Sequence, residues 1–176
     1  MKKHTEKYWD NFYKNHKAFK KPSSFARFVK PYIKGKVTEF GCGDCRDIIY
    51  FNKHGVGANG YDLSFNNIDI ESVVAGEVHH KCPPYIYTRF FWHSIDRKLQ
   101  LKILNWVTGT LFIEARTTED KPKDLFGKHK RNLVNVPTLV KDLKENGFKI
   151  DYLAEGCFSP FMGENPKLIR VICHKG

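Results

Sequence analysis

Short apolar runs alternate with amphipathic stretches along most of the chain, and glycine or proline residues separate them. The runs have the length and the β-branched and aromatic composition of strands. We expect strands at 36–40, 58–63, 73–78, 85–89, 110–116, 149–154 and 168–174. Apolar residues at helical spacing predict helices at 47–53, 94–107 and 137–146.

The alternation of strands with helices predicts the fold class. Strands joined through helices favour an α/β, Rossmann-like fold with a mainly parallel sheet and helices on both faces. Residues 156–166 join the last two strands directly, which predicts a C-terminal antiparallel hairpin. A full crossover helix needs roughly ten to twelve residues plus loops, and too few residues lie around the strand expected at 73–78. At least one crossover is therefore expected to be shortened.

The chain of 176 residues is predicted to form a single domain, because no repeat or linker interrupts the pattern. Residues 1–36 are expected to form a basic, aromatic helical segment, and residues 37–176 the Rossmann-like core. Aromatic residues at helical spacing predict two helices in the first segment, one carrying Tyr8, Trp9, Phe12 and Tyr13 and the other Phe25, Phe28 and Val29.

Charge is distributed unevenly along the chain. Residues 1–36 hold eleven Lys or Arg and two acids, within a net charge of +11 for the whole sequence. Such asymmetry favours an anionic partner, either a phosphorylated small molecule, a nucleic acid or a membrane surface; the alternative is a solvated lysine face. No apolar run approaches the roughly 20 residues of a membrane span, and the start of the chain lacks the features of a signal peptide. We therefore expect a cytoplasmic protein without a membrane span, of undetermined oligomeric state.

The five cysteines are expected to be reduced thiols, because their number is odd and no export signal accompanies them. Cys42 and Cys45 have the C-x-x-C spacing of a redox dithiol or of half a zinc site. No second such pair, and no His pair at metal spacing, follows them. We therefore expect no metal site.

A glycine-rich turn follows the first expected strand and leads into a helix. In an open parallel sheet, ligands bind at this edge, beside the N-terminus of the helix. Gly41 and Gly43 allow a close backbone approach, and Glu39 supplies a carboxylate for a cationic amine. Asp62 ends the second strand nineteen residues after Gly43, a spacing typical of a carboxylate that accepts hydrogen bonds from ribose hydroxyls. The alternative is a tight turn with two solvated acids. Arg46 replaces the third glycine of the dinucleotide pattern, which disfavours a nicotinamide cofactor.

Residues 37–47 and 60–64 resemble the first two motifs of the class I S-adenosylmethionine-dependent methyltransferases. Residues 87–93, 111–117 and 165–172 are similar to small members of that class associated with bacterial surface-polysaccharide genes. The resemblance implies S-adenosylmethionine as the cofactor. It places Glu39, Gly41 and Gly43 at the methionine end, Asp62 at the ribose, and Glu77 at the adenine amine. The alternative for Glu77 is an exposed charge at a strand end.

Acceptor residues are expected near the carboxyl ends of the strands at 85–89 and 110–116. His93 is our candidate base, because imidazole titrates near neutral pH; the alternative is a packed residue at a helix start. Arg89 and Arg116 have the chemistry to clamp a phosphate or carboxylate, with His129 and Arg131 in a nearby basic loop. The alternative for these cations is ion pairing with the acids Glu114, Glu119 and Asp120.

Three functions are compatible with these features. The first is methylation of a small polar or phosphorylated acceptor, such as a sugar or polysaccharide precursor. The second is nucleic-acid methylation, motivated by the basic aromatic segment 1–36. The third is a partner subunit that binds the cofactor and lacks activity.

Overall fold

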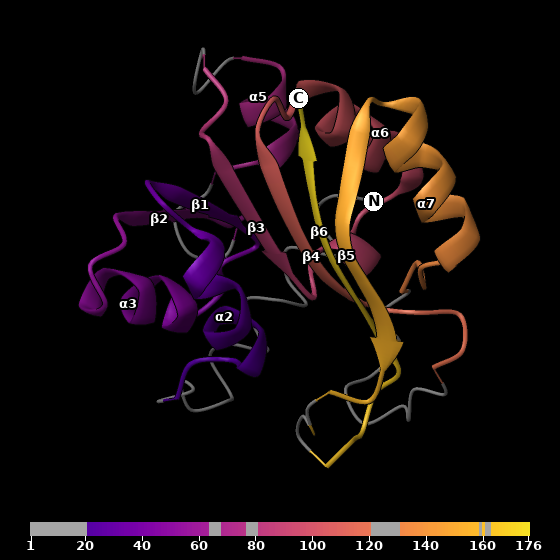
Figure 1. Ribbon diagram of the computed structural model, residues 1–176, viewed down its shortest axis with the longest axis horizontal. Coiled ribbons are helices and arrows are strands. Elements are labelled where there is room, and N and C mark those ends of the chain that lie inside the picture. Colours follow the sequence, from indigo (N-terminus) through magenta and orange to yellow (C-terminus); the bar gives the residue numbers. More distant parts are fainter. Residues whose placement is uncertain (1–20, 64–67, 77–80, 121–130, 159, 161–162) are drawn as a thin grey trace.

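A six-stranded mixed sheet forms the centre of the protein (Figure 1). The computed structural model describes residues 21–63, 68–76, 81–120, 131–158, 160 and 163–176. Within these residues the strand order is β2-β1-β3-β4-β6-β5. The strands are β1 (Val37–Phe40), β2 (Ala58–Tyr61), β3 (Tyr85–Arg89), β4 (Thr110–Arg116), β5 (Phe148–Gly156) and β6 (Leu168–Lys175).

The strand directions confirm the expected fold class. β2, β1, β3 and β4 are mutually parallel, whereas β6 runs antiparallel to both of its neighbours, β4 and β5. Every residue of β1 is buried, as in a parallel strand covered on both faces. In β5 burial alternates along the strand, as in an edge strand with one solvated face.

Helices cover both faces of the sheet. On one face, α2 (Ser24–Val29) and α3 (Arg46–Lys53) bury Phe25, Val29 and Phe51 against Tyr87. On the other face, α5 (Ile70–Val74), α6 (Arg97–Trp106) and α7 (Val136–Glu145) pack apolar side chains on the sheet. Two 3-10 turns, η1 (Lys30–Tyr32) and η2 (Trp92–Ser94), follow α2 and β3. None of the helices in the described ranges has the length and apolar character that a membrane crossing requires.

The prediction of a strand at 73–78 is wrong for those of its residues that the structure describes. Residues Ile70–Val74 form the short helix α5, because the Asp69 side chain accepts a hydrogen bond from the backbone N–H of Glu71 and caps its N-terminus. Gly76, with φ of +81°, ends this region in the left-handed conformation. The described part of the connection from β2 to β3 contains the five-residue helix α5.

The N-terminal segment is described from residue 21 onward. The helix expected around Phe25 and Phe28 is α2, and the helix expected around Tyr8 and Trp9 lies outside the described residues.

Buried Asp47 fixes α2 to the rest of the fold. Its carboxylate accepts hydrogen bonds from the Ser23 backbone N–H at 2.7 Å, the Ser23 hydroxyl at 2.7 Å and the Tyr87 hydroxyl at 2.9 Å. Ser23 is also the N-cap of α2, and its hydroxyl accepts a hydrogen bond from the backbone N–H of Ala26. One side chain of α3 thus joins α2 to β3.

We predict that Asp47→Ala lowers the free energy of unfolding by about 3 kcal/mol, because it leaves the buried Ser23 N–H and Tyr87 hydroxyl without their acceptor. Tyr87→Phe removes the hydrogen bond to Asp47 and the contact of the Tyr87 hydroxyl with the Ser23 hydroxyl at 3.1 Å, and should cost about 1 kcal/mol. Urea unfolding followed by circular dichroism measures both, with Glu145→Ala at an exposed position of α7 as the neutral control. Equal midpoints for Asp47→Ala and this control would contradict the anchoring role.

Candidate functional site

The glycine loop, residues 41–45, connects β1 to α3 and contains three left-handed residues. The φ angles are +73° at Gly41, +52° at Gly43 and +58° at Cys45. The loop is tied to the end of β2, because the carbonyl oxygen of Tyr61 accepts hydrogen bonds from the N–H groups of Gly41 at 2.8 Å and Cys42 at 3.4 Å. Glycine is needed at position 41, since a Cβ there would lie 2.6 Å from the Phe91 ring.

Asp62 lies directly against this loop. Its Oδ2 accepts a hydrogen bond from the Gly43 backbone N–H at 3.0 Å. The glycine turn and the second acid, which the sequence connects only by spacing, are therefore in contact at the carboxyl ends of β1 and β2. A carboxylate accepts several hydrogen bonds, so this contact is compatible with a further donor from a ligand.

Glu39 is a buried acid immediately before the loop. Its side chain is 4% exposed, and its Oε2 makes no hydrogen bond to any residue that the structure describes. Burial, together with the negative charges of Asp47 and Cys45, raises the pKa of Glu39 well above its ordinary value. An orphaned buried carboxyl oxygen costs free energy in the ligand-free protein, and a cationic ligand group would offset that cost.

A row of charged residues crosses the sheet beyond Glu39. Arg89, Glu114 and Arg170 are direct cross-strand neighbours on β3, β4 and β6. Arg89 Nε lies 3.0 Å from Glu114 Oε1 as an ion pair, and Arg170 Nε donates to Glu114 Oε2 at 2.7 Å. Two guanidinium groups therefore share one buried carboxylate.

Phe90 holds an unusual backbone conformation at the end of β3. Its φ of +56° lies in the left-handed region that bulky residues rarely adopt. In this conformation its ring lies 4.2 Å from the guanidinium carbon of Arg89, a cation–π contact. Strain of this kind is found at sites where the surrounding structure fixes a particular side-chain position.

His93 is almost completely buried in η2. Its Nδ1 lies 3.0 Å from the backbone nitrogen of Arg116 and accepts a hydrogen bond from that N–H, so the neutral ring carries its proton on Nε2. This geometry favours the alternative of a packed residue that orients the end of β4.

Arg116 is equally enclosed. Its guanidinium group forms ion pairs with Asp120, at 2.8 Å, and with Glu164, and its side chain is 3% exposed. This geometry favours the ion-pairing alternative for Arg116. Arg131 is half-buried before α7, whereas Glu77 and His129 lie outside the described residues.

Sequence reasoning missed several residues of this region. Asp47, Glu164 and Arg170 all take part in its buried polar network. Asp47 had a readable signal, since it lies on the same helix face as the apolar residues Ile48 and Phe51. Glu164 is 48 positions away from Arg116 and no local pattern connects them.

Within the described ranges, no three or more His, Cys, Asp or Glu residues are arranged to hold a metal ion.

The sequence matches no protein-family model and no curated protein. Solved structures do resemble the fold. The glycopeptide N-methyltransferase MtfA complexed with sinefungin has a TM-score of 0.62 at 13% identity, covering 92% of this chain and 90% of that one. A methyltransferase from Methanosarcina mazei has a TM-score of 0.65 at 13% identity, with coverages of 84% and 96%. A methyltransferase from Archaeoglobus fulgidus has a TM-score of 0.61 at 14% identity, covering 85% of this chain and 92% of that one. The chain therefore has the fold of S-adenosylmethionine-dependent methyltransferases.

Proposed function

We propose that this protein is an S-adenosylmethionine-dependent methyltransferase that acts on a small polar or phosphorylated acceptor. One observation carries the proposal: a buried acid with an orphaned oxygen, Glu39, precedes a left-handed glycine loop that is hydrogen-bonded to a second acid, Asp62. Both acids lie at the carboxyl edge of a parallel sheet, where ligands bind in open α/β folds.

The chemistry of these groups fits the cofactor. A ligand ammonium would supply Glu39 Oε2 with both a donor and a positive charge, which a neutral ligand cannot do. Asp62 has the acceptor chemistry for ribose hydroxyls. Glu77 is proposed as the adenine contact because residues 76–78 resemble the methyltransferase motif in which an acid contacts the adenine amine. When bound, S-adenosylmethionine supplies a methyl group already activated on a sulfonium.

The protein's own contribution to such a transfer is mainly position. An in-line displacement at an activated carbon is accelerated by holding the nucleophile close and aligned. We propose that Arg89, beside Glu114 and Arg170, contacts an anionic acceptor, since a guanidinium group has the geometry to bind a phosphate or carboxylate. Arg131 remains a proposed acceptor contact, together with His129.

The other acceptor candidates have weaker support. Arg116 is neutralised by two carboxylates, and the Nδ1 of His93 already accepts a backbone hydrogen bond. We propose that both residues fix the end of β4 next to the acceptor; a base role for His93 would require its ring to reorient. A sugar or polysaccharide precursor is the acceptor class that the sequence resemblance favours.

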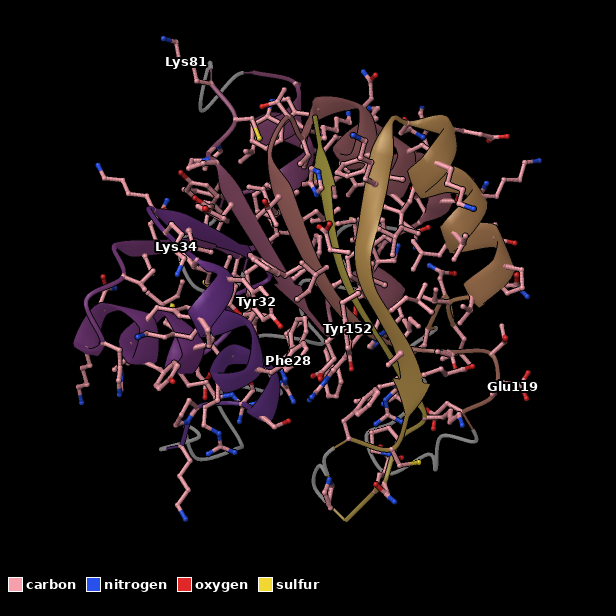
Figure 2. The ribbon with its side chains drawn as sticks, in the orientation of Figure 1. Phe28, Tyr32, Lys34, Lys81, Glu119 and Tyr152 are labelled. Carbon is pink, nitrogen blue, oxygen red and sulfur yellow. The ribbon has the colours of Figure 1, made fainter. Side chains whose placement is uncertain are left out.

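The fold does not choose the acceptor. The neighbours include a glycopeptide N-methyltransferase and a protein whose structure concerns conversion of a disulfide into a thioacetal during echinomycin biosynthesis. A nucleic-acid acceptor is our second candidate, because aromatic and basic side chains meet on α2 and η1. Phe28, Tyr32 and Tyr152 lie together (Figure 2). The ring centroid of Phe28 is 6.0 Å from that of Tyr32 and 5.0 Å from that of Tyr152. Lys34, just beyond η1, is exposed.

We predict that calorimetry detects S-adenosylhomocysteine binding to the wild type and a loss of about tenfold or more in affinity for Asp62→Ala, because ribose hydrogen bonds to a charged acceptor disappear. Asp62→Asn keeps an acceptor for Gly43 and separates the ribose contact from the loop contact. Glu145→Ala serves as the control. A wild type that binds neither this ligand nor S-adenosylmethionine would end the proposal.

Glu39 predicts a specific pH dependence of cofactor binding. Its pKa is raised in the ligand-free protein, and a bound ammonium favours the carboxylate. Below the raised pKa the group must release a proton to bind, so affinity should increase as the pH rises through that pKa and then level off. Glu39→Gln should bind about tenfold more weakly at the plateau, with a flatter profile.

We predict that Glu39→Gln makes the ligand-free fold more stable, although it weakens cofactor binding. In the unfolded chain Glu39 ionises at its ordinary pKa, so the ligand-free fold loses stability as the pH rises toward the raised folded value. The Gln variant lacks this loss, and its melting temperature should exceed that of the wild type at neutral pH. If the melting temperatures of the wild type and Glu39→Gln changed with pH in the same way, both the raised pKa of Glu39 and its proposed role in ammonium binding would be contradicted.

The two acceptor classes predict different salt responses. A nucleic-acid enzyme should bind random oligonucleotides with a steep salt slope of about 0.9 per neutralised phosphate. We expect a small acceptor, so the wild type should bind oligonucleotides weakly and the double variant Lys30→Gln/Lys34→Gln should bind them equally weakly. Fluorescence anisotropy across a salt series measures this, and a steep slope that these substitutions reduce would favour the nucleic-acid candidate.

A further inference from the structure

The glycine loop contains two thiols in contact. Cys42 Sγ and Cys45 Sγ are 3.4 Å apart. A disulfide requires a separation of about 2.05 Å, so the sulfurs need to approach by only roughly 1.4 Å. The other three cysteines contact carbonyl oxygens elsewhere, Cys82 at Pro83, Cys157 at Asn165 and Cys173 at Leu111.

The two thiols occupy different environments. Cys42 is 5% exposed, and its hydrogen bond with Cys45, followed by its burial, raises the pKa of its thiol. Cys45 is half-buried, and its hydrogen bond with Cys42 lowers the pKa of its thiol. Cys45 is also the N-cap residue of α3, an eight-residue helix, and a helix N-terminus stabilises a thiolate. The accessible sulfur is thus the nucleophile and the buried one its resolving partner.

We propose that Cys42 and Cys45 form a reversible dithiol–disulfide pair that hydroperoxides oxidise, and that the disulfide weakens cofactor binding by the glycine loop. The first half stands on the geometry of the pair, whereas the second rests on the proposed function.

The chemistry balances with one hydroperoxide. The Cys45 thiolate attacks a peroxide oxygen, the O–O bond breaks, and Cys45 becomes a sulfenic acid. With hydrogen peroxide the leaving hydroxide takes up a proton and departs as water. Cys42 then attacks the Cys45 sulfur, and the displaced hydroxide takes the Cys42 proton to form a second water. The two thiols lose two electrons, and the peroxide gains them. A small dithiol reverses the reaction by exchange.

The packing around Cys42 determines which part of the loop must move. A Cβ on Gly60 would lie 2.7 Å from Cys42 Cβ and 2.8 Å from its Sγ, so Cys42 already fits tightly against β2. The approach therefore falls to Cys45, whose left-handed backbone adjoins Gly43 and Asp44. Movement of Cys45 toward Cys42 therefore strains the hydrogen bond from the Gly43 N–H to Asp62, which joins the glycine loop to the second acid.

The sequence makes the pair easy to detect. Trypsin cleaves after Lys36 and Arg46, so residues 37–46 form one peptide that carries both cysteines. Cys82, Cys157 and Cys173 fall on separate peptides. The reduced full-length chain would be treated with hydrogen peroxide, denatured, alkylated and digested for mass spectrometry.

We expect peptide 37–46 to escape alkylation, to be lighter by two hydrogen atoms and to return to the alkylated form after dithiothreitol. Cys42→Ser should instead accumulate a sulfenic acid on Cys45, trapped by dimedone, and Cys157→Ser should behave like the wild type. Full alkylation of both cysteines at peroxide levels that oxidise exposed Cys157 would overturn the proposal. A disulfide linking peptide 37–46 to another peptide would do so as well.

Cofactor affinity provides the second measurement. Oxidised wild type and Cys157→Ser should bind S-adenosylhomocysteine at least about fivefold more weakly than their reduced forms, a modest coupling between sites. Cys45→Ser should show no change on oxidation. Equal affinities in the two redox states would refute the effect of the disulfide on cofactor binding, but not the formation of the disulfide. A reduced protein that does not bind the ligand refutes the proposed function and the switch, while the peptide result still decides the dithiol.

Discussion

The parallel, in-register pairing of β1 with β2 and β3 is the constraint on which the site depends. Because Glu39 pairs with Gly60 and Tyr87, the last residues of these strands end at one edge of the sheet. The glycine loop leaves that edge, and Asp62 meets it there through the Gly43 N–H. A slip of β2 by one residue would turn its side chains to the other face and remove the second acid from the loop.

Local sequence patterns predicted most of this framework because strands and glycine turns leave signals within a few residues. The strand expected at 110–116 has those bounds in the structure, and the spacing from Gly43 to Asp62 corresponds to a hydrogen bond. The strand expected at 73–78 was wrong because apolar Val73 and Val74 have strand-like composition, whereas the Asp69 cap imposes a helix. Apolar composition alone cannot distinguish a short buried strand from one turn of buried helix.

The polar network of the site was much harder to predict. Arg116 reaches Glu164, and Arg170 reaches Glu114, 56 positions earlier in the chain. Such pairs depend on the sheet order, in which β6 lies next to β4, and this order has no local signature. The burial of Glu39 was easier to predict, because it follows from the place of this residue in a short strand that is covered on both faces.

The position of β6 also has a consequence for how the chain folds. This strand follows β5 in sequence but lies between β5 and β4 in the sheet. Before β6 pairs with it, the edge of β4 that faces β6 has unpaired backbone N–H and C=O groups. The pairing of β6 with β4 joins residues more than fifty positions apart, such as Leu111 and Cys173, which are 62 positions apart. Pairings of this range form slowly, so we expect the joining of β6 to β4 to be a slow step in the formation of the sheet.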